Sequence, residues 1–209
     1  MSKKRLCTFL KSATICGVYR AVREAQARQR AAVINRPPLQ QSHLQMQITQ
    51  PVTMLTDYAL GAVTFYFAFV LARTMGPRNR VSGWLWSAAF GFSAVGALVG
   101  GSFHAFALEL AESTLHTLWT ITVFCIGTSL GLMVGGVHAA YIKKEDGSMK
   151  WLAAGILMTV VGLAVQLTGF RHTEDFNHND VFHVIQIAAY YFLFRFARML
   201  QDRFSMPSQ

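Results

Sequence analysis

The stretch VSGWLWSAAFGFSAVGALVGGSFHAF, residues 81–106, contains no Asp, Glu, Lys or Arg over its whole length. A helix needs about 20 apolar residues to cross the ~30 Å hydrocarbon core of a bilayer, and this stretch is long enough to do so. Other apolar runs that approach or exceed this length are residues 55–72, 117–141, 151–169 and 181–199. The sequence therefore predicts an all-α fold, a polytopic transmembrane helix bundle of about five spans.

The composition agrees with one integral membrane domain. Hydrophobic residues make up 53% of the chain and charged residues 14%, whereas soluble domains carry about 25% charged residues. The net charge of +9 lies mostly in a basic N-terminal tail, because residues 1–50 hold nine Lys and Arg against Glu24 alone. This placement argues against a nucleic-acid partner and leaves the lipid bilayer as the expected surroundings.

Three parts of the chain are expected: a basic tail and linker at 1–51, a transmembrane helical domain at 52–201 and a short cytoplasmic tail at 202–209. Three interpretations of the N-terminal tail remain open. It is a polybasic segment that touches anionic lipid, a cleaved targeting sequence, or an extension upstream of a true start at Met46 or Met54.

The loop charges predict the orientation. The loop 73–80 has three arginines and no acid, and the loop 143–150 has three lysines. Basic loops stay on the cytoplasmic side of a membrane. We therefore expect a multi-pass protein of a bacterial inner membrane with its C-terminus in the cytoplasm; the oligomeric state stays open.

With this topology, the acids and histidines gather at the outer ends of the predicted spans. Ionisable groups at membrane depth usually face a protein interior, so their convergence indicates a functional site. His183 follows Asp180 by three residues, and the two share one helix face. The groups concerned are Asp57, His104, Glu109, Glu112, His116, Glu174, Asp175, His178, Asp180 and His183.

Two local patterns add detail to the helices. Gly96 with Gly100, and Gly127 with Gly131, have the small-xxx-small spacing that permits close contact between the second and third spans. Asn179 or Asp180 is expected to be the N-cap of the last helix, because short polar side chains accept the first free backbone N–H groups.

Imidazoles and carboxylates from different helices at one depth are the side chains of a first-row metal site. A catalytic zinc keeps three protein ligands and a water, and that water can attack an ester or amide carbonyl. The expected Zn²⁺ ligands are His104, His183 and one of His178 or His116, with His104, His178 and His183 as the leading set. Proton relays and plain interfacial side chains use the same residue types, so both alternatives stay open.

The segments GSFHA at 101–105 and HNDVFH at 178–183 resemble motifs of the CREST superfamily, which includes alkaline ceramidases, progestin/adiponectin-type receptors and haemolysin-III-like proteins. Those proteins resemble one another as zinc-dependent transmembrane hydrolases. His116 stands where that superfamily has an acid, the closing histidines have four intervening residues rather than three, and the superfamily has seven spans. The whole sequence also looks like small bacterial multi-pass membrane proteins with a similar His-Asn-Asp-x-x-His segment.

The leading hypothesis is a metal-dependent hydrolase of a lipid amide or ester. In it, Asp180 would orient a metal ligand or carry a proton, and Ser102 or His116 would position the attacked carbonyl or water. The alternative is a non-enzymatic receptor, transporter component or lipid-binding scaffold that uses the same site for a headgroup or a proton. A third hypothesis is that these side chains only meet headgroups and water.

Overall fold

The computed structural model describes residues 48–77, 79–140, 147–169 and 176–202. Within these ranges the chain forms five α-helices and no strand, which confirms the predicted all-α bundle. The helices are α3 (Pro51–Arg73), α4 (Arg80–Ala105), α5 (Glu112–His138), α6 (Ser148–Thr168) and α7 (His178–Asp202). Most of the basic tail, the final residues 203–209, and Glu174 and Asp175 lie outside the described residues.

Four of these helices, α3, α4, α5 and α6, are long and apolar enough to cross a membrane. The fifth predicted span, α7, is a helix of 25 residues. It is long enough to cross a membrane, but it is not apolar enough to be counted with the other four. Its polar residues explain the difference, because Asp180, His183 and Gln186 face the inside of the bundle, where all three are buried.

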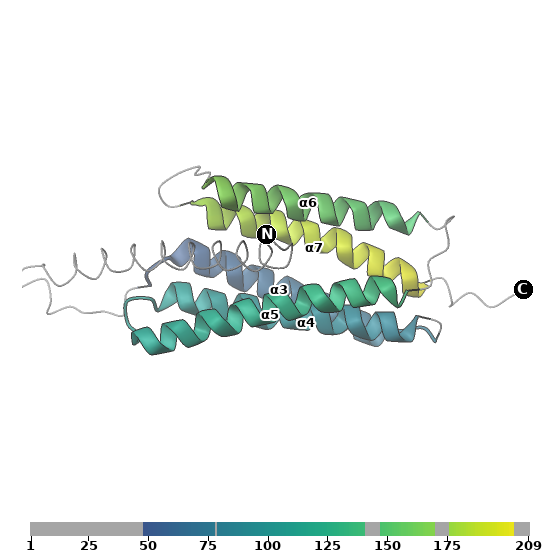
Figure 1. The fold of residues 1–209 in the computed structure, drawn as a ribbon, viewed down its shortest axis with the longest axis horizontal. Coiled ribbons are helices and arrows are strands. Elements are labelled where there is room, and N and C mark those ends of the chain that lie inside the picture. The colour runs from purple at the N-terminus through teal and green to yellow at the C-terminus, as the bar shows by residue number, and fades with distance from the viewer. Residues whose placement is uncertain (1–47, 78, 141–146, 170–175, 203–209) are drawn as a thin grey trace, which may run out of the picture. The chain divides into compact units, whose positions relative to one another are not determined.

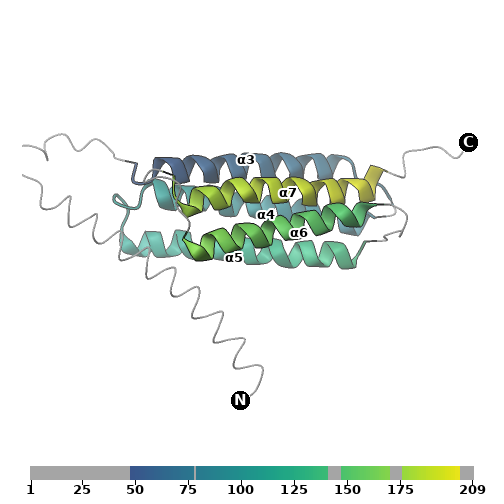
Figure 2. The ribbon, with the colours of Figure 1, turned by 90° about the horizontal axis from the view of Figure 1, so that it is seen from above.

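The five helices belong to one compact unit made of Gln50–Ala105 and Ala111–Gln209. In it, α3 packs on α4, α4 on α5, and α6 on α7, while α7 also packs on α3 (Figure 1 and Figure 2). Neighbouring helices in the chain are antiparallel. We call the end at which α3, α5 and α7 begin the site end, and the opposite end the core end. The turn Phe106–Leu110 belongs to the chain's other unit.

Glycines bring the helices close together at several crossings. A Cβ atom on Gly96 would lie 3.2 Å from Cys125 Cβ, and one on Gly101 would lie 2.6 Å from the ring of Tyr58. The predicted close approach of α4 to α5 is therefore confirmed at Gly96. It is wrong for Gly127 and Gly131, since a Cβ on either would meet nothing within 4 Å. These two glycines lie on the face of α5 that points away from α4.

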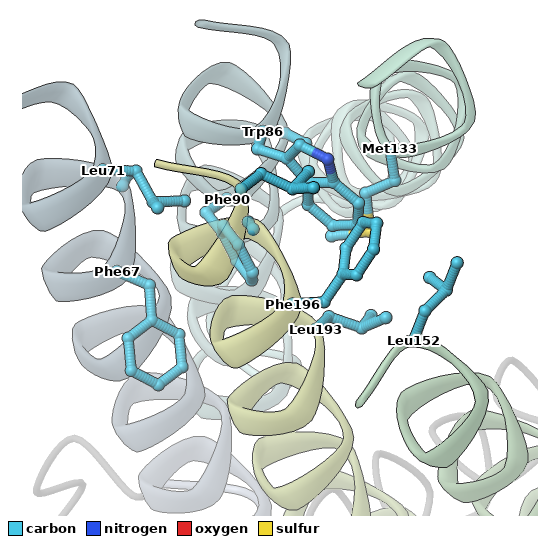
Figure 3. Close-up of a cluster of buried hydrophobic side chains, with 12 residues drawn as sticks. Phe67, Leu71, Trp86, Phe90, Met133, Leu152, Leu193 and Phe196 are labelled. Atoms are coloured by element: carbon cyan, nitrogen blue, oxygen red, sulfur yellow. The ribbon is translucent and has the colours of Figure 1, made fainter. Parts of the chain in front are cut away.

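The hydrophobic core fills the core end of the bundle (Figure 3). Phe67 of α3 stacks on Phe194 of α7 with ring centroids 4.3 Å apart. Trp86 contacts Phe196 edge to face at 5.6 Å, and both side chains are almost completely buried. Offset and edge-to-face aromatic pairs contribute about 0.5–1.5 kcal/mol beyond the area that they bury. At the core end, buried and largely aromatic side chains from all five helices thus pack together.

Candidate functional site

The site end contains a hydrogen-bonded imidazole between α3 and α7. Nε2 of His183 lies 3.2 Å from Oδ1 of Asp57, and Nδ1 of the same ring lies 3.1 Å from the hydroxyl oxygen of Thr56. The same hydroxyl oxygen is also within donor distance of the Thr53 carbonyl oxygen, at 3.0 Å. Asp57 is 5% exposed and His183 is 9% exposed. Both ring nitrogens of a buried histidine are therefore engaged by the first two turns of α3.

The start of α7 is fixed by a capping box, in which an N-cap side chain and a side chain three residues later each accept a backbone N–H. Asn177 Oδ1 accepts the N–H of Asn179 at 2.8 Å, and Asp180 Oδ2 accepts the N–H of Asn177 at 2.8 Å. The N-cap is thus Asn177, and the expectation of Asn179 or Asp180 was wrong. The amide of Asn177 also donates to the Thr53 hydroxyl at 3.3 Å, which ties α7 to α3 a second time.

His104, one residue before the end of α4, brings a third helix to this site. It interacts electrostatically with His183 and Asp180, and Asp57 interacts in the same way with Asp180. The sequence analysis expected these acids and imidazoles at one end of the bundle, and the structure places them there. We call Asp57, His104, Asp180 and His183 the acid–imidazole cluster.

A second polar layer lies one to two turns further along α7. Gln186 hydrogen-bonds the hydroxyl of Tyr190. That hydroxyl accepts a hydrogen bond from Ser93 of α4 at 3.1 Å, and the hydroxyl oxygens of Ser93 and Ser129 are 2.7 Å apart. Polar side chains therefore line α7 from its first turn to the edge of the aromatic core.

Two of the residues predicted to act in catalysis lie outside the acid–imidazole cluster. Ser102 donates its hydrogen to the carbonyl of Leu98 at 2.9 Å, and Tyr58 lies 3.2 Å from the Ser102 oxygen. His116 is exposed, while its neighbour Leu115 is the residue that faces the inside of the bundle. Ser102 therefore bonds Leu98 and contacts Tyr58, and His116 lies on the outside of the bundle.

The expected zinc ligands are not assembled by the described geometry. No group of three or more His, Cys, Asp or Glu side chains in the described part of the chain is arranged to hold a metal ion. His183 has the clearest reason, because Thr56 and Asp57 already occupy its two nitrogens. His178, the first residue of α7, is only partly buried. The residues present at the site end therefore do not fit a three-histidine zinc centre.

The sequence pattern alone assigns Asp57 no specific role and does not single out Thr56 or Asn177. One signal in the sequence could have found the first two. Thr56 and Asp57 are adjacent polar residues in an otherwise apolar run, within the first two turns of α3. Such a pair at membrane depth needs a partner from another helix, and the only described acid or imidazole bonded to it is His183.

Comparison with known proteins gives one result. The chain matches a family described as "Family of unknown function (DUF6962)" over residues 52–135 and 127–202, which together cover more than half of its length. No curated protein and no solved structure matches the chain. The matched residues include all five helices except Pro51, the first residue of α3, and the whole acid–imidazole cluster. The chain therefore belongs to the DUF6962 family.

Proposed function

We propose that this chain is a non-enzymatic integral membrane protein, a transporter component or a receptor, whose Asp57–His183 pair binds and releases a proton near one membrane surface. The single observation that carries the proposal is the buried contact between His183 and Asp57, in which Nε2 and Oδ1 lie 3.2 Å apart inside the bundle. Ionisable groups inside membrane proteins commonly serve in proton relays and ion pathways.

The Thr56 hydroxyl lies 3.0 Å from the Thr53 carbonyl oxygen and 3.1 Å from Nδ1 of His183. Its hydrogen can go to either of these acceptors, so the imidazole hydrogen can stand on Nδ1 or on Nε2. The contact of 3.2 Å between Nε2 and Asp57 Oδ1 needs a hydrogen between the imidazole and the carboxyl group. We propose that this pair, buried between α3 and α7, takes up and releases a proton.

The proposed orientation follows from the described cations. All of the Lys and Arg residues in the described ranges lie at the core end: Arg73, Arg80, Lys150, Arg195 and Arg198. By the positive-inside rule this favours a cytoplasmic core end and C-terminus. The acid–imidazole cluster would then exchange protons with the outer side of a bacterial inner membrane.

The metal-dependent lipid hydrolase has less support. It requires a metal with three protein ligands and an open position for water, whereas no described group offers three ligands. We therefore place the proton-binding function first. The zinc content of the detergent-purified protein distinguishes the proton-binding protein from the metal-dependent hydrolase, since a hydrolase of this kind requires about one zinc per chain.

Infrared difference spectroscopy tests the proposed function. We expect the purified wild-type protein to show a carbonyl band of a protonated carboxylic acid that shifts in D₂O and disappears on alkaline titration. Asp57→Asn removes this band, because it removes the carboxyl group of the pair. Glu109→Gln, which changes an exposed carboxyl group outside the acid–imidazole cluster, is the control and keeps the band. If the wild-type protein shows no such band at any pH at which it is folded, the proposal is wrong. About one zinc ion per chain would instead favour the hydrolase.

A further inference from the structure

The core end carries two cations beside one tryptophan, where α6 begins and α7 approaches its end. Nζ of Lys150 lies 5.9 Å from the ring centroid of Trp151, and Cζ of Arg195 lies 5.2 Å from the same centroid. Both distances are within the range of cation–π contacts. The Trp151 ring also contacts Phe192 of α7, with centroids 5.9 Å apart. We call Lys150, Trp151 and Arg195 the basic–tryptophan cluster.

No acid within the described ranges balances the two charges of this cluster. Neither Lys150 nor Arg195 forms an ion pair or a hydrogen bond in the described part of the chain. Glu112 and Asp180 lie in the first turns of α5 and α7, at the site end. Two positive charges beside one ring repel each other, so an anion placed there is attracted by both of them.

The backbone at the start of α6 also suits an anion. The N-cap is Gly147, which makes no side-chain hydrogen bond to the helix, and α6 has no acid in its first turn. The first N–H groups of a helix have no partner within it and carry a partial positive charge. Lys150 lies against this end, because its Cε is 3.9 Å from the position of a Cβ atom on Gly147. Charge from the backbone and from Lys150 therefore combines at the first turn of α6.

Exposed apolar side chains continue from each cation toward the middle of the bundle. On α7, Tyr191 stands one turn before Arg195 and is exposed, and on α6, Leu157 stands two turns after Lys150 and is exposed. The principal neighbour of α6 is α7 (Figure 1), so most of the α6 surface is left to lipid. A phospholipid has the same arrangement of chemistry, since its phosphate lies next to its acyl chains.

We infer that the basic–tryptophan cluster binds the phosphate of an anionic phospholipid, whose acyl chains lie against the exposed faces of α6 and α7. Basic sites between transmembrane helices bind anionic headgroups, and Trp side chains favour the headgroup level of a membrane. An acidic soluble protein suits this place less well, because the apolar surface next to the cations belongs in hydrocarbon. The inference goes beyond the proposed function and does not depend on the Asp57–His183 pair.

The test uses the full-length protein, freed of lipid in an uncharged detergent. Phosphatidylglycerol is the anionic probe, and phosphatidylcholine with the same acyl chains is the control without net charge. Native mass spectrometry counts the lipids bound to each chain during a lipid titration. We expect one phosphatidylglycerol to bind at a lower concentration than any further lipid. Phosphatidylcholine should show no such first binding step.

Three single-charge variants test the position of the lipid. Arg195→Gln and Lys150→Gln each remove one charge of the cluster, and we expect each to weaken the first binding step about fivefold, the effect of one Lys or Arg near anionic lipid. Arg73→Gln is the matched control. Arg73 lies at the same end of the bundle with its Cζ 4.2 Å from the ring centroid of Phe69, but outside the cluster, so its loss leaves the first step unchanged.

All three substituted residues are exposed, and we expect the variants to keep the melting temperature of the wild-type protein in lipid-free detergent. Either cluster variant alone is sufficient for the test. If phosphatidylcholine binds as tightly as phosphatidylglycerol, the site is wrong. It is also wrong if Arg73→Gln weakens binding as much as Arg195→Gln does, because a general attraction to the basic end then explains the binding.

Inorganic phosphate distinguishes a lipid from a free anion. We expect phosphate at millimolar concentration to leave the first phosphatidylglycerol bound, because phosphate has no acyl chains to contact α6 and α7. If phosphate displaces the lipid, the cluster recognises a free anion and the lipid proposal is wrong. None of these outcomes changes the infrared result that tests the Asp57–His183 pair.

Discussion

At the scale of single residues, Thr56 connects α3 to the buried imidazole although it carries no charge. Its hydroxyl lies 3.1 Å from Nδ1 of His183 and 3.0 Å from the Thr53 carbonyl oxygen, so it bridges the ring and the backbone of α3. Valine has nearly the same shape as threonine but no hydroxyl. A valine at this position would therefore leave Nδ1 of His183 without its hydrogen-bond partner.

Thr56→Val is expected to lower the free energy of unfolding in detergent by about 1 kcal/mol or more, because it leaves a buried imidazole nitrogen without its hydrogen-bond partner. Thr64→Val is the matched control. Thr64 is buried in the same helix, but its hydroxyl bonds only to backbone carbonyls of that helix, so its loss costs less than about 0.5 kcal/mol. Chemical unfolding followed by Trp fluorescence measures both. If both variants lose the same free energy of unfolding, the Thr56–His183 hydrogen bond does not contribute more to stability than the Thr64 hydrogen bonds do.

At the scale of elements, the two glycine pairs show how helix faces are used. Gly96 on α4 contacts α5 closely, whereas Gly127 on α5 lies open. The two pairs look identical in sequence, because a GxxxG pattern does not say which neighbour a helix turns toward. A large side chain should therefore be harmful at one position and harmless at the other.

Gly96→Ile is expected to destabilise the bundle by about 1–3 kcal/mol, since overpacking forces α4 and α5 apart. Gly127→Ile should leave stability unchanged or raise it slightly, because isoleucine there meets no protein atom in the described structure and suits a lipid-facing position. Thermal unfolding of the two purified variants in one detergent measures the difference. A stable Gly96→Ile protein would mean that α4 and α5 do not meet as described.

The sequence was sufficient to predict the helices and the end at which the ionisable groups gather. Long runs without charge define helices such as α4, and antiparallel succession places Asp57, His104 and His183 at one end. Their partners could not be predicted, because each step along a helix turns the side chain by about 100°. Whether His183 meets Thr56 or a metal depends on the rotation of α3 and α7 about their axes, which only packing determines.

At the scale of the whole molecule, the separation of charges predicts which loops lie inside the cell. In a variant whose native cysteines are replaced, Ala111→Cys at the site end should react with a membrane-impermeant maleimide added to intact cells. Pro77→Cys at the core end should react only after the cells are permeabilised, because basic loops stay in the cytoplasm. Both positions are exposed. The reverse labelling pattern would invert the proposed orientation.

The depth of Asp57 has a further consequence for any charge that binds there. It lies six residues after Pro51 in a helix of 23 residues, which is about 9 Å from the start of α3. A charge that crosses the full bilayer gains or loses about 2.3 kcal/mol per 100 mV. An ion that enters from the near surface crosses only about a quarter of that electric field. Occupancy of this shallow position therefore follows the ion concentrations on one side and depends little on the voltage.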